Sequence, residues 1–471
     1  MFNVKIGAKN GGTGHIYWQW TYSGIASLGF LIYGVESGWL SPFIQELKSL
    51  HTPLKTPVDD TTITWWASIL PMSGIFFVLL FSHTADVFGR KWSLIIGTLP
   101  EIVSIIIRLA WPTPMFVIVA RIFSGISAAA YFVIIPVYIR EISEDGMLGR
   151  LGSLPILSQN VGFLVVYAVG AFFNYFTVLW IILFFPIIMA LLMLSSPESP
   201  SYLVKRNKIN EAIKSIAFLR GLAINDEKVV ITVQHMQYHE EGFKNMSKIS
   251  MITILRDKPL RKGVCLILLI LATHSWNGAF AIVTYASAVM LSTGTELNIS
   301  PELQTISLPI VMIIASLTLT SIAEKFGRRH IQAVAYLTSG ISLAILAVFI
   351  LLQDYVYSTP PWLPLTCMIV IAAMYAGGIR PLPFVVATEM FQFQVRAKIM
   401  GCLTVFVGLM NSTHLYAYTP IKNTFGLPAT FLIFALYNII GVISSLLLPE
   451  TRGKSEEEIR EELENKFKIR L

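Results

Sequence analysis

Two short charged segments of this chain combine residue types and spacing suited to reversible ion pairing. They read Asp86-Val87-Phe88-Gly89-Arg90-Lys91 and Glu324-Lys325-Phe326-Gly327-Arg328-Arg329. Acidic residues follow both segments in matching order and at nearly the same separation, Glu141 with Glu389 and Glu198 with Glu450. Exposed pairs of arginine and carboxylate gain only about 0–1 kcal/mol each. Pairs of that strength can open and close again, which is the chemistry of a gate.

The pairing within each segment follows from its charges. We expect Arg90 to pair with Glu141, and the second segment to repeat this pairing with Glu389, while Gly lets the backbone turn tightly. We expect these pairs to close the cytoplasmic side of the protein in the state whose outer side is open. They break when the helix bundle rocks into the opposite state. The alternative is that these charges only keep the loops on the cytoplasmic side of a membrane. The predicted gating residues are Asp86, Arg90, Glu141, Glu198, Glu324, Arg328, Arg329, Glu389 and Glu450.

Five further charges fall inside apolar runs, at Glu36, Glu101, Arg108, Arg121 and Arg380. Each costs about 2.5–3.5 kcal/mol at the centre of a bilayer. We therefore expect these side chains to face the interior of a helix bundle and to find partners there. Glu101 and Arg108 lie on one helix, close to the same face, and are expected to pair with neighbours. Arg380 either points into a cavity or reaches toward a helix end.

The elements that carry these charges are long apolar runs. The chain is 54% hydrophobic and 13% charged, whereas a soluble protein is about 25% charged. A span needs about 20 apolar residues. Cys265, Cys367 and Cys402 all lie in such runs and are expected to be core residues without a disulfide or metal role. The predicted spans are 18–40, 63–82, 92–111, 115–138, 151–173, 177–196, 262–290, 302–323, 331–352, 364–387, 398–418 and 428–448.

The positive charge follows the membrane topology. Most of the 35 Lys and Arg residues fall at the N-terminus, in alternate loops, in the central linker and in the tail. This asymmetry is the positive-inside rule, and it predicts cytoplasmic termini. The formal net charge of +7 therefore reflects topology and not a nucleic-acid partner. No cleavable signal is expected, because residues 1–17 are polar and the first apolar run is long enough to remain as an anchor.

The matched segments indicate a duplicated membrane protein. The sequence predicts an all-α membrane protein with twelve transmembrane helices in two six-helix halves and both termini cytoplasmic. The halves are 1–202 and 261–449, with a helical linker at 203–260 and a tail at 450–471. Within the linker, apolar residues from Ile209 to Ala217 recur at helical spacing. We also predict a capping box at Ser455–Glu458 and a possible glycan at Asn298.

Several short motifs follow one another along the chain. They are Asp86-x-x-Gly89-Arg90-Lys91, Arg121-x-x-x-Gly125, Pro136-x-Tyr138-x-x-Glu141, Pro197-Glu198-Ser199-Pro200, Glu324-x-x-Gly327-Arg328-Arg329, Pro381-x-Pro383-Phe384, Val395-Arg396-x-Lys398 and Pro449-Glu450-Thr451. Taken in order, they resemble the sugar porter branch of the major facilitator superfamily over essentially the whole chain. The stretches Gly38-Trp39-x-Ser41-Pro42 and Asn160-x-Gly162 look most like the insect facilitated trehalose transporter-like group. The resemblance implies two six-helix halves, a central polar cavity and alternating access, and it adds Arg396 to the gate.

The resemblance also shows where this chain departs from the family. Substitutions at Ser82, Val87 and Ser201 lead us to expect a thinner charge network in the N-terminal half. In the seventh span, the family's Gln-Gln pair is missing, so the cavity is more apolar and aromatic than a hexose site. Gly and Pro interrupt the tenth span, where such carriers place their sites. We predict that the substrate sits between His274, Ser275 and Tyr285 of the seventh span and Phe384 and Asn411 of the C-terminal half, where aromatic faces can stack on a sugar ring and polar groups supply directional bonds.

Arg121 matches an arginine that faces a carboxylate of the first span in proton-coupled family members. Glu36 lies one position from that carboxylate, which on a helix is about 100° of rotation. Glu36 and Arg121 are therefore a candidate proton-coupling pair. The alternatives are a permanent structural pair, or a Glu36 side chain that reaches the outer mouth.

The main functional hypothesis is a multi-pass plasma-membrane transporter for a small polar solute, of trehalose or hexose type. One alternative is a nutrient sensor of the same fold that does not transport. Another is an organic-anion carrier that uses Arg380 and His274. We expect no enzyme activity, no cofactor and no metal. The expected partners are the solute and the lipid bilayer, with the protein as a monomer.

Overall fold

The computed structural model describes residues 14–245, 256–293, 300–353, 360–391, 393–452, 454, 458, 459 and 461–463, and every regular element in this part is a helix. Asn298 and most of the predicted capping box lie outside the described residues. The helices are α1 (Gly14–Gly38), α2 (Leu40–Lys48), α3 (Asp60–Val87), α4 (Arg90–Ala110), α5 (Pro114–Ile142), η1 (Asp145–Met147), α6 (Leu148–Phe172), α7 (Tyr175–Ser195), α8 (Pro200–Lys205), α9 (Ile209–Arg220), α10 (Glu227–Asn245), α12 (Lys258–Trp276), α13 (Ala279–Thr284), α14 (Ala286–Ser292), α15 (Pro301–Thr305), α16 (Ser307–Phe326), α17 (Arg328–Gln353), α18 (Leu363–Met374), η2 (Tyr375–Ile379), α19 (Leu382–Met390) and α20 (Phe393–Leu447).

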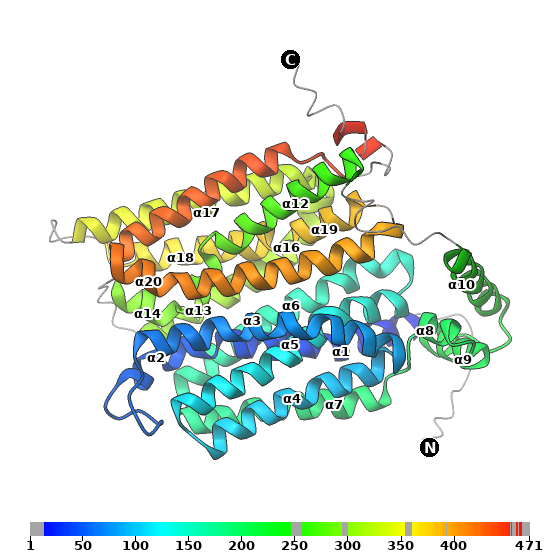
Figure 1. Ribbon diagram of the computed structural model, residues 1–471, viewed down its shortest axis with the longest axis horizontal. Helices are drawn as coiled ribbons and strands as arrows, with labels where there is room; N and C mark the ends of the chain where they lie inside the picture. Colours follow the sequence, from blue (N-terminus) through cyan, green and yellow to red (C-terminus); the bar gives the residue numbers. More distant parts are fainter. Residues whose placement is uncertain are drawn as a thin grey trace.

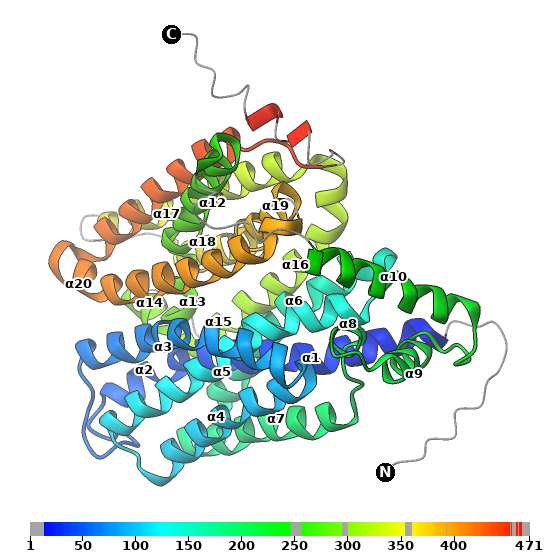
Figure 2. The ribbon, with the colours of Figure 1, turned by 45° about the vertical axis from the view of Figure 1, so that its right-hand side comes forward.

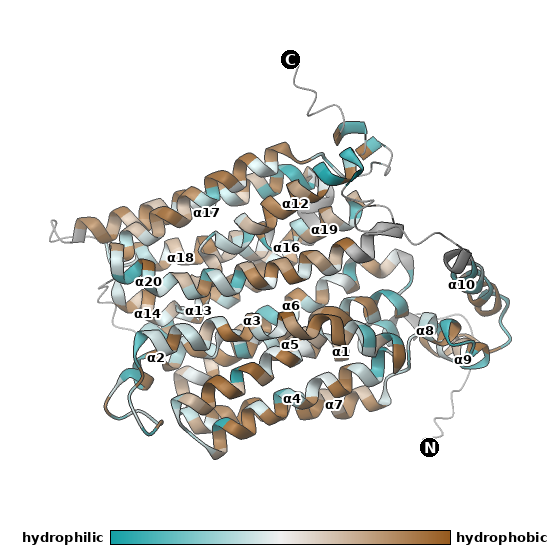
Figure 3. Cartoon of the chain, in the orientation of Figure 1, coloured by the Kyte–Doolittle hydropathy of each residue, from teal (hydrophilic) through white to brown (hydrophobic). Residues whose placement is uncertain are grey.

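Long apolar helices dominate the molecule. Within the described residues, ten are long and apolar enough to cross a membrane. One of these spans, within α20, contains a break at Gly426 (φ 83°, ψ 165°), where two helices meet. Large apolar side chains such as Phe76, 73% exposed, and Leu79, 77% exposed, lie on the surface, and the long helices are coloured mainly as hydrophobic in Figure 3. Surfaces of this kind suit hydrocarbon rather than water, so the chain is a multi-pass membrane protein.

The helices form two bundles that lie side by side. In Figure 1, α1 and α3–α7 form the lower bundle, and α12–α20 form the upper one. The bundles meet where α3 packs on α20 and α6 packs on α16. Helices α8–α10 lie at one end of the molecule, called here the linker end, and α2 and α14 lie at the opposite, distal end (Figures 1 and 2).

Two glycines allow α1 and α6 to cross backbone to backbone. A Cβ atom at Gly34 would lie 2.2 Å from the carbonyl oxygen of Gln159, and one at Gly162 would lie 2.1 Å from that of Leu31. Membrane helices commonly use small residues for such close approach. The crossing fixes α6, which carries Gln159 and Asn160 into the middle of the molecule.

Two of the apolar runs are interrupted. The run predicted at 262–290 is divided into α12, α13 and α14, and Gly278 between the first two has a φ of 87°. In the run predicted at 364–387, the π-helix η2 separates α18 from α19. Its wide turn closes with a hydrogen bond of 3.0 Å from the backbone N–H of Arg380 to the carbonyl of Tyr375. Single π-turns occur frequently at functional sites.

The linker carries the amphipathic helix that its spacing predicts. This helix, α9, buries Ala212, Ile216 and Ala217 in a small apolar cluster with residues of α8 and α10. The hydroxyl of Ser215 donates to the carbonyl of Glu198, at 2.8 Å. The linker is thereby attached to the end of the first bundle.

Candidate functional site

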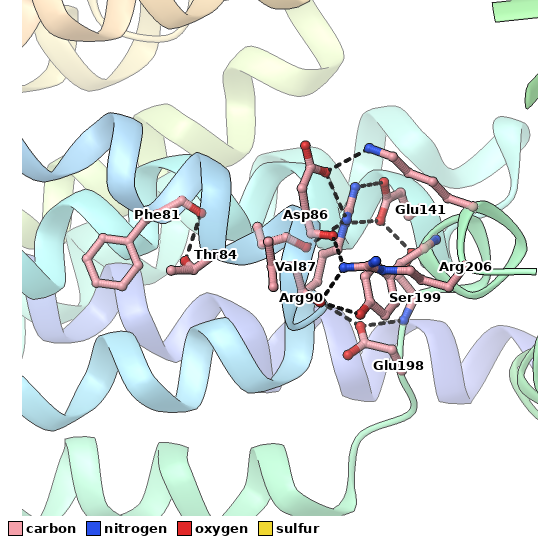
Figure 4. A network of polar contacts seen from close by, with 12 residues as sticks. Phe81, Thr84, Asp86, Val87, Arg90, Glu141, Glu198, Ser199 and Arg206 are labelled. Atoms are coloured by element: carbon pink, nitrogen blue, oxygen red, sulfur yellow. Dashed lines mark hydrogen bonds and ion pairs between the residues drawn. The ribbon is translucent and has the colours of Figure 1, made fainter. Parts of the chain in front are cut away.

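The first charged segment forms a compact cluster at the linker end, called here the N-clasp (Figure 4). The carboxylate of Glu198 accepts hydrogen bonds from the backbone N–H groups of Arg90 (2.9 Å), Lys91 (3.2 Å) and Ser199 (2.8 Å). It therefore caps the N-terminus of α4, where the unpaired N–H groups favour an anion. Gly89 has a φ of 95°, and a Cβ atom there would lie 2.2 Å from Glu198. Only glycine leaves room for the carboxylate.

The side chain of Arg90 joins the N-clasp to the end of α5. Its Nε and Nη2 atoms donate to the two oxygens of Glu141, at 2.8 and 2.9 Å. Its Nη1 donates to the carbonyl of Ala85 at 2.9 Å, and the hydroxyl of Ser199 donates to Glu141 at 2.5 Å. Such a two-pronged pair fixes geometry as well as charge. The structure thus contains the expected Arg90–Glu141 pair.

The second charged segment repeats the capping arrangement in a cluster called here the C-clasp. The carboxylate of Glu450 accepts from the backbone N–H groups of Arg328 (3.0 Å), Arg329 (3.2 Å) and Arg452 (3.2 Å). Gly327 has a φ of 82°, and a Cβ atom there would lie 2.6 Å from Glu450. The same physical requirement therefore places glycine at both positions.

The C-clasp also repeats the arginine pair. Arg328 donates from Nη2 to Glu389 at 3.0 Å, and the hydroxyl of Thr451 donates to Glu389 at 2.5 Å. Arg328, rather than Arg329, is therefore the partner of Glu389. The side chains of Glu324 and Arg396 lie outside the part of the chain that the structure describes.

The substitutions at Ser82, Val87 and Ser201 predict a thin charge network in the N-terminal half, but the N-clasp has several further contacts. Asp86 forms an ion pair of 3.1 Å with Lys205, and Arg206 donates to the carbonyls of Asp86 and Val87 at 3.1 and 2.7 Å. These cations come from the α8 region, to which sequence analysis assigned no role. Burial raises the pKa of Glu198, and this outweighs the opposing effect of its N–H donors.

Each clasp braces the linker end of its own bundle. The N-clasp joins the loop before α4 to the ends of α5 and α7, and the C-clasp joins the start of α17 to the end of α19 and to the segment after α20. In this conformation, their described contacts hold helices within a bundle rather than bridging the two bundles. Both bundles are thus stiffened in the same way at the same end.

A second charged cluster is buried within the first bundle. Glu36 forms ion pairs with Arg108 at 2.5 Å and with Arg121 at 3.2 Å, and Arg121 also donates to the backbone carbonyl of Glu36 at 2.6 Å. Both guanidinium groups lie over the ring of Trp39, at 5.3 and 5.9 Å. Glu36 is only 2% exposed, so it does not reach an outer mouth. Arg108 takes Glu36 as its partner, a pairing that sequence analysis left open.

The remaining buried carboxyl, Glu101, joins this cluster through a serine. The hydroxyl of Ser124 lies 3.2 Å from Glu101 and 3.4 Å from Glu36. Ser104 contacts the same hydroxyl at 2.8 Å. The four charged side chains, Glu36, Glu101, Arg108 and Arg121, therefore form one connected network of α1, α4 and α5.

A group of aromatic side chains lies between α12 and the span that η2 interrupts. His274 stacks on Tyr375, with ring centroids 5.7 Å apart and planes inclined by 6°, and meets Phe384 edge to face at 6.4 Å. The guanidinium of Arg380 also lies over the ring of Tyr375, at 6.0 Å. The structure therefore brings together the predicted residues His274 and Phe384. Tyr375 had not been predicted, because its position depends on the π-turn.

Arg380 links this aromatic group to α6 of the other bundle. It donates to the side-chain oxygens of Gln159 and, at 3.4 Å, Asn160. Asn160 in turn donates to the hydroxyl of Ser316 at 2.8 Å. Sequence analysis gave no role to Gln159 or Ser316. The sequence feature that could have indicated this contact is the adjacent pair of amide side chains, Gln159 and Asn160, inside an apolar run.

The other predicted substrate residues are distributed differently. Tyr285 stacks on Tyr418, with centroids 4.8 Å apart, rather than on Phe384. Ser275 is buried and Asn411 is partly buried, and within the described residues the Ser275 hydroxyl and the Asn411 Oδ1 have no hydrogen-bond partner. The predicted set thus falls into a His274–Phe384 group and a separate Tyr285 group.

Direct contacts join the two bundles at the distal end. The hydroxyl of Ser41 accepts from the backbone N–H of Ser287 at 3.2 Å, and the hydroxyl of Ser287 donates to the carbonyl of Ser41. Nearby, the hydroxyl of Tyr167 donates to the carbonyl of Val283. In the middle of the molecule, Ser412 of α20 donates to the carbonyl of Ser68 of α3, at 2.9 Å.

Comparison with known proteins identifies the family to which this architecture belongs. The family described as "Sugar (and other) transporter" matches residues 23–463. The chain belongs to this transporter family. Its members are transporters rather than enzymes, in agreement with the sequence analysis.

Relatives to which the chain is similar include insect proteins. A facilitated trehalose transporter Tret1 of Anopheles gambiae is 25% identical over 441 residues, which cover 93% of this chain and 55% of that protein. The protein of the same name from Bombyx mori is 24% identical over 444 residues, which cover 93% and 85%. The chain thus spans about half the length of the mosquito relative.

Solved structures show the same fold. The partially occluded, inward-open xylose transporter XylE from E. coli superposes with a TM-score of 0.76 at 18% identity, over 93% of this chain and 100% of that one. The proton:xylose symporter XylE bound to 6-bromo-6-deoxy-D-glucose gives 0.75 at 19% identity, over 95% and 99%. The chain therefore has the major facilitator fold.

Proposed function

We propose that this protein carries a sugar of the trehalose or hexose type across the plasma membrane by alternating access. The observation that supports this most strongly is the pair of equivalent clasps, one at the linker end of each bundle. Two braced bundles that pack on each other along α3–α20 and α6–α16 can rock as rigid bodies about a site between them. Membership of a sugar transporter family agrees with this mechanism.

The proposed topology has twelve spans and cytoplasmic termini. The ten apolar helices become twelve when α20 is divided at Gly426 and α1, 25 residues long, is included. The proposed halves are 1–202 and 261–449, joined by the linker at 203–260 and followed by the tail at 450–471. The linker end is then cytoplasmic, and the contacts between Ser41 and Ser287 close the outer side.

We place the sugar against His274 and Phe384, with Ser275, Asn411 and Tyr285 as further contacts. Aromatic rings can stack on the apolar face of a pyranose, and buried polar atoms without partners supply directional bonds. In the described residues such atoms include His274 Nδ1, Ser275 Oγ and Asn411 Oδ1. His274 and Ser275 lie at the end of α12 in the first interrupted run, and Asn411 lies on α20.

We assign the Glu36 cluster a structural role and infer facilitated transport. A carboxylate held by both Arg108 and Arg121 balances charge that is otherwise costly in a membrane. A carrier that couples to protons through Glu36 has to release this carboxylate in each cycle. Facilitated transport does not depend on a proton gradient, whereas transport that is coupled to protons through Glu36 does.

Uptake into proteoliposomes tests the proposal. Labelled trehalose, glucose, fructose and glucuronate, a sugar acid, are offered with and without an inward proton gradient. We expect saturable uptake of at least one sugar, with an extent that does not depend on the gradient. Uptake above equilibrium that requires the gradient would establish proton coupling. Absence of uptake for every sugar would favour the sensor hypothesis.

A further inference from the structure

The guanidinium group of Arg380 is a buried positive charge whose hydrogen-bond partners are neutral. Arg380 is 9% exposed and directly follows the π-helix η2. It donates to the amide oxygens of Gln159 and, at 3.4 Å, of Asn160. Within the described residues it forms no ion pair. Charge at this position is therefore solvated by dipoles and is not neutralised.

The contrast with the other buried arginines shows that this is unusual for the molecule. Arg108 and Arg121 are each paired with Glu36, at 2.5 and 3.2 Å. An arginine side chain stays protonated in proteins, so it cannot become neutral to escape a poor environment. Buried charges are normally paired. Where the chain supplies no partner, the counter-ion can come from a bound molecule.

The surroundings of Arg380 suit a ring-shaped polar molecule. The guanidinium lies over Tyr375, whose ring stacks on His274, and Phe384 closes the edge of this group. His274 is 3% exposed, and its Nδ1 has no hydrogen-bond partner in the described part of the chain. Aromatic faces, one polar atom without a hydrogen-bond partner and one cation thus converge in the second bundle, where Arg380 reaches α6 of the first bundle.

We propose that the transported sugar carries a carboxylate and that Arg380 receives it. The proposal rests on the proposed function, because it takes the substrate to be a sugar. The planar guanidinium matches a carboxylate with two parallel hydrogen bonds. One guanidinium balances one negative charge, whereas a phosphate ester carries about −1.5 to −2 and leaves an excess. A carboxylate is therefore favoured over a phosphate.

The amides of α6 hold the guanidinium when the site is empty. An entering carboxylate replaces the oxygens of Gln159 and Asn160 with charged oxygens, which bind a guanidinium more strongly. Because these amides belong to the other bundle, the exchange also releases one link between the bundles. Substrate binding and the freedom to rock are thereby connected.

Competing uptake in proteoliposomes that contain the full chain tests the proposal. D-glucuronate, glucose 6-phosphate and glucose share one ring and differ in the charged group. We expect wild-type protein to take up glucuronate in preference to both others. Arg380→Gln should lower the ratio of glucuronate to glucose uptake by roughly 10- to 150-fold, the range for a hydrogen bond to a charged group. Arg380→Lys keeps the charge and should keep part of the preference.

A second variant and a control separate charge from folding. Gln159→Glu supplies an internal carboxylate to Arg380 with little change of shape, and it should also remove the preference. Arg150→Gln removes an exposed charge from the same helix, α6, and should leave the ratio as in the wild type. Each variant is compared only after it elutes as a single species in size-exclusion chromatography.

The possible failures can be distinguished. Transport of glucose without transport of glucuronate overturns the role of Arg380 and leaves the proposed sugar carrier standing. An unchanged ratio in both Arg380→Gln and Gln159→Glu does the same. Preference for glucose 6-phosphate overturns the assignment of a carboxylate. If none of the three molecules is taken up, and trehalose and fructose are not taken up either, the proposed function itself fails.

Discussion

Glycine and glutamate depend on each other in both clasps. Gly89 and Gly327 adopt positive φ angles of 95° and 82°, and each lies where a side chain would collide with Glu198 or Glu450. The carboxylate needs this room to reach the N–H groups at the start of the following helix. At the scale of single residues, a tight turn and an anion site are therefore one feature.

Gly89→Ala should destabilise the protein by about 1–3 kcal/mol, because the backbone at φ 95° and ψ 170° suits only glycine. Thermal unfolding of the purified protein in detergent measures this loss. Gly24→Ala is the control, since a Cβ atom there meets nothing within 4 Å and alanine favours the helix. Equal unfolding temperatures for the two variants would show that the turn does not require glycine.

The carboxyl group of Glu198 in the N-clasp makes the stability of the folded protein depend on pH. Burial raises the pKa of its carboxyl, so the charged form costs the folded protein more than the unfolded chain. That cost is present above the folded-state pKa and disappears as the pH falls below the ordinary value for glutamate. As the pH falls from about 7 to about 4, the unfolding temperature of the wild type should therefore rise relative to that of Glu198→Gln. A relative fall over this range would contradict the assignment.

At the scale of helices, the clasps connect the ends of spans without touching the aromatic site. Glu141→Ala and Glu389→Ala should each lower the maximal transport rate by about tenfold or more, which corresponds to about 1.4 kcal/mol. The half-saturating sugar concentration should change less. Glu211→Ala is the control, because its pair with Lys208 is 56% exposed on both sides and is worth little. A change confined to half-saturation would argue against gating.

The clasps could be predicted from sequence because their parts repeat in order. Arg90, Glu141 and Glu198 have counterparts in the second half of the chain, and the matching order and spacing of the two sets indicate which residues pair. The Arg380–Gln159 contact offers no such signal, because the residues lie 221 positions apart and on different bundles. The place of Tyr375 depends on a π-turn, which shifts the register of the helix. Hydrophobic periodicity does not predict such a turn.

The same distinction explains the substrate residues. His274 and Phe384 lie next to each other, and each belongs to one of the two interrupted runs. Tyr285 does not join them, because the break at Gly278 and a second one at Tyr285 redirect the chain toward Tyr418. A break can be anticipated from glycine, but its direction depends on packing against other helices.

At the scale of the whole molecule, the distal contacts define one end of the transport cycle. Ser41→Cys together with Ser287→Cys should form a disulfide, in a background where Cys265, Cys367 and Cys402 are replaced by alanine. We expect oxidation to stop transport and a reducing agent to restore it, because this end must open in each cycle. Each single cysteine variant serves as the control. Full transport with the disulfide formed would mean that the distal end does not open.

The central claim is that two braced bundles rock about a sugar site, and exchange across the membrane tests it most directly. Proteoliposomes are loaded with unlabelled sugar, and the uptake of a trace of the same labelled sugar is followed. An alternating-access carrier predicts transient accumulation of label above its equilibrium level, because the unlabelled sugar inside competes with the label for the inward-facing site and so slows its exit. Uptake that only approaches equilibrium, or no uptake by correctly folded protein, would contradict the account.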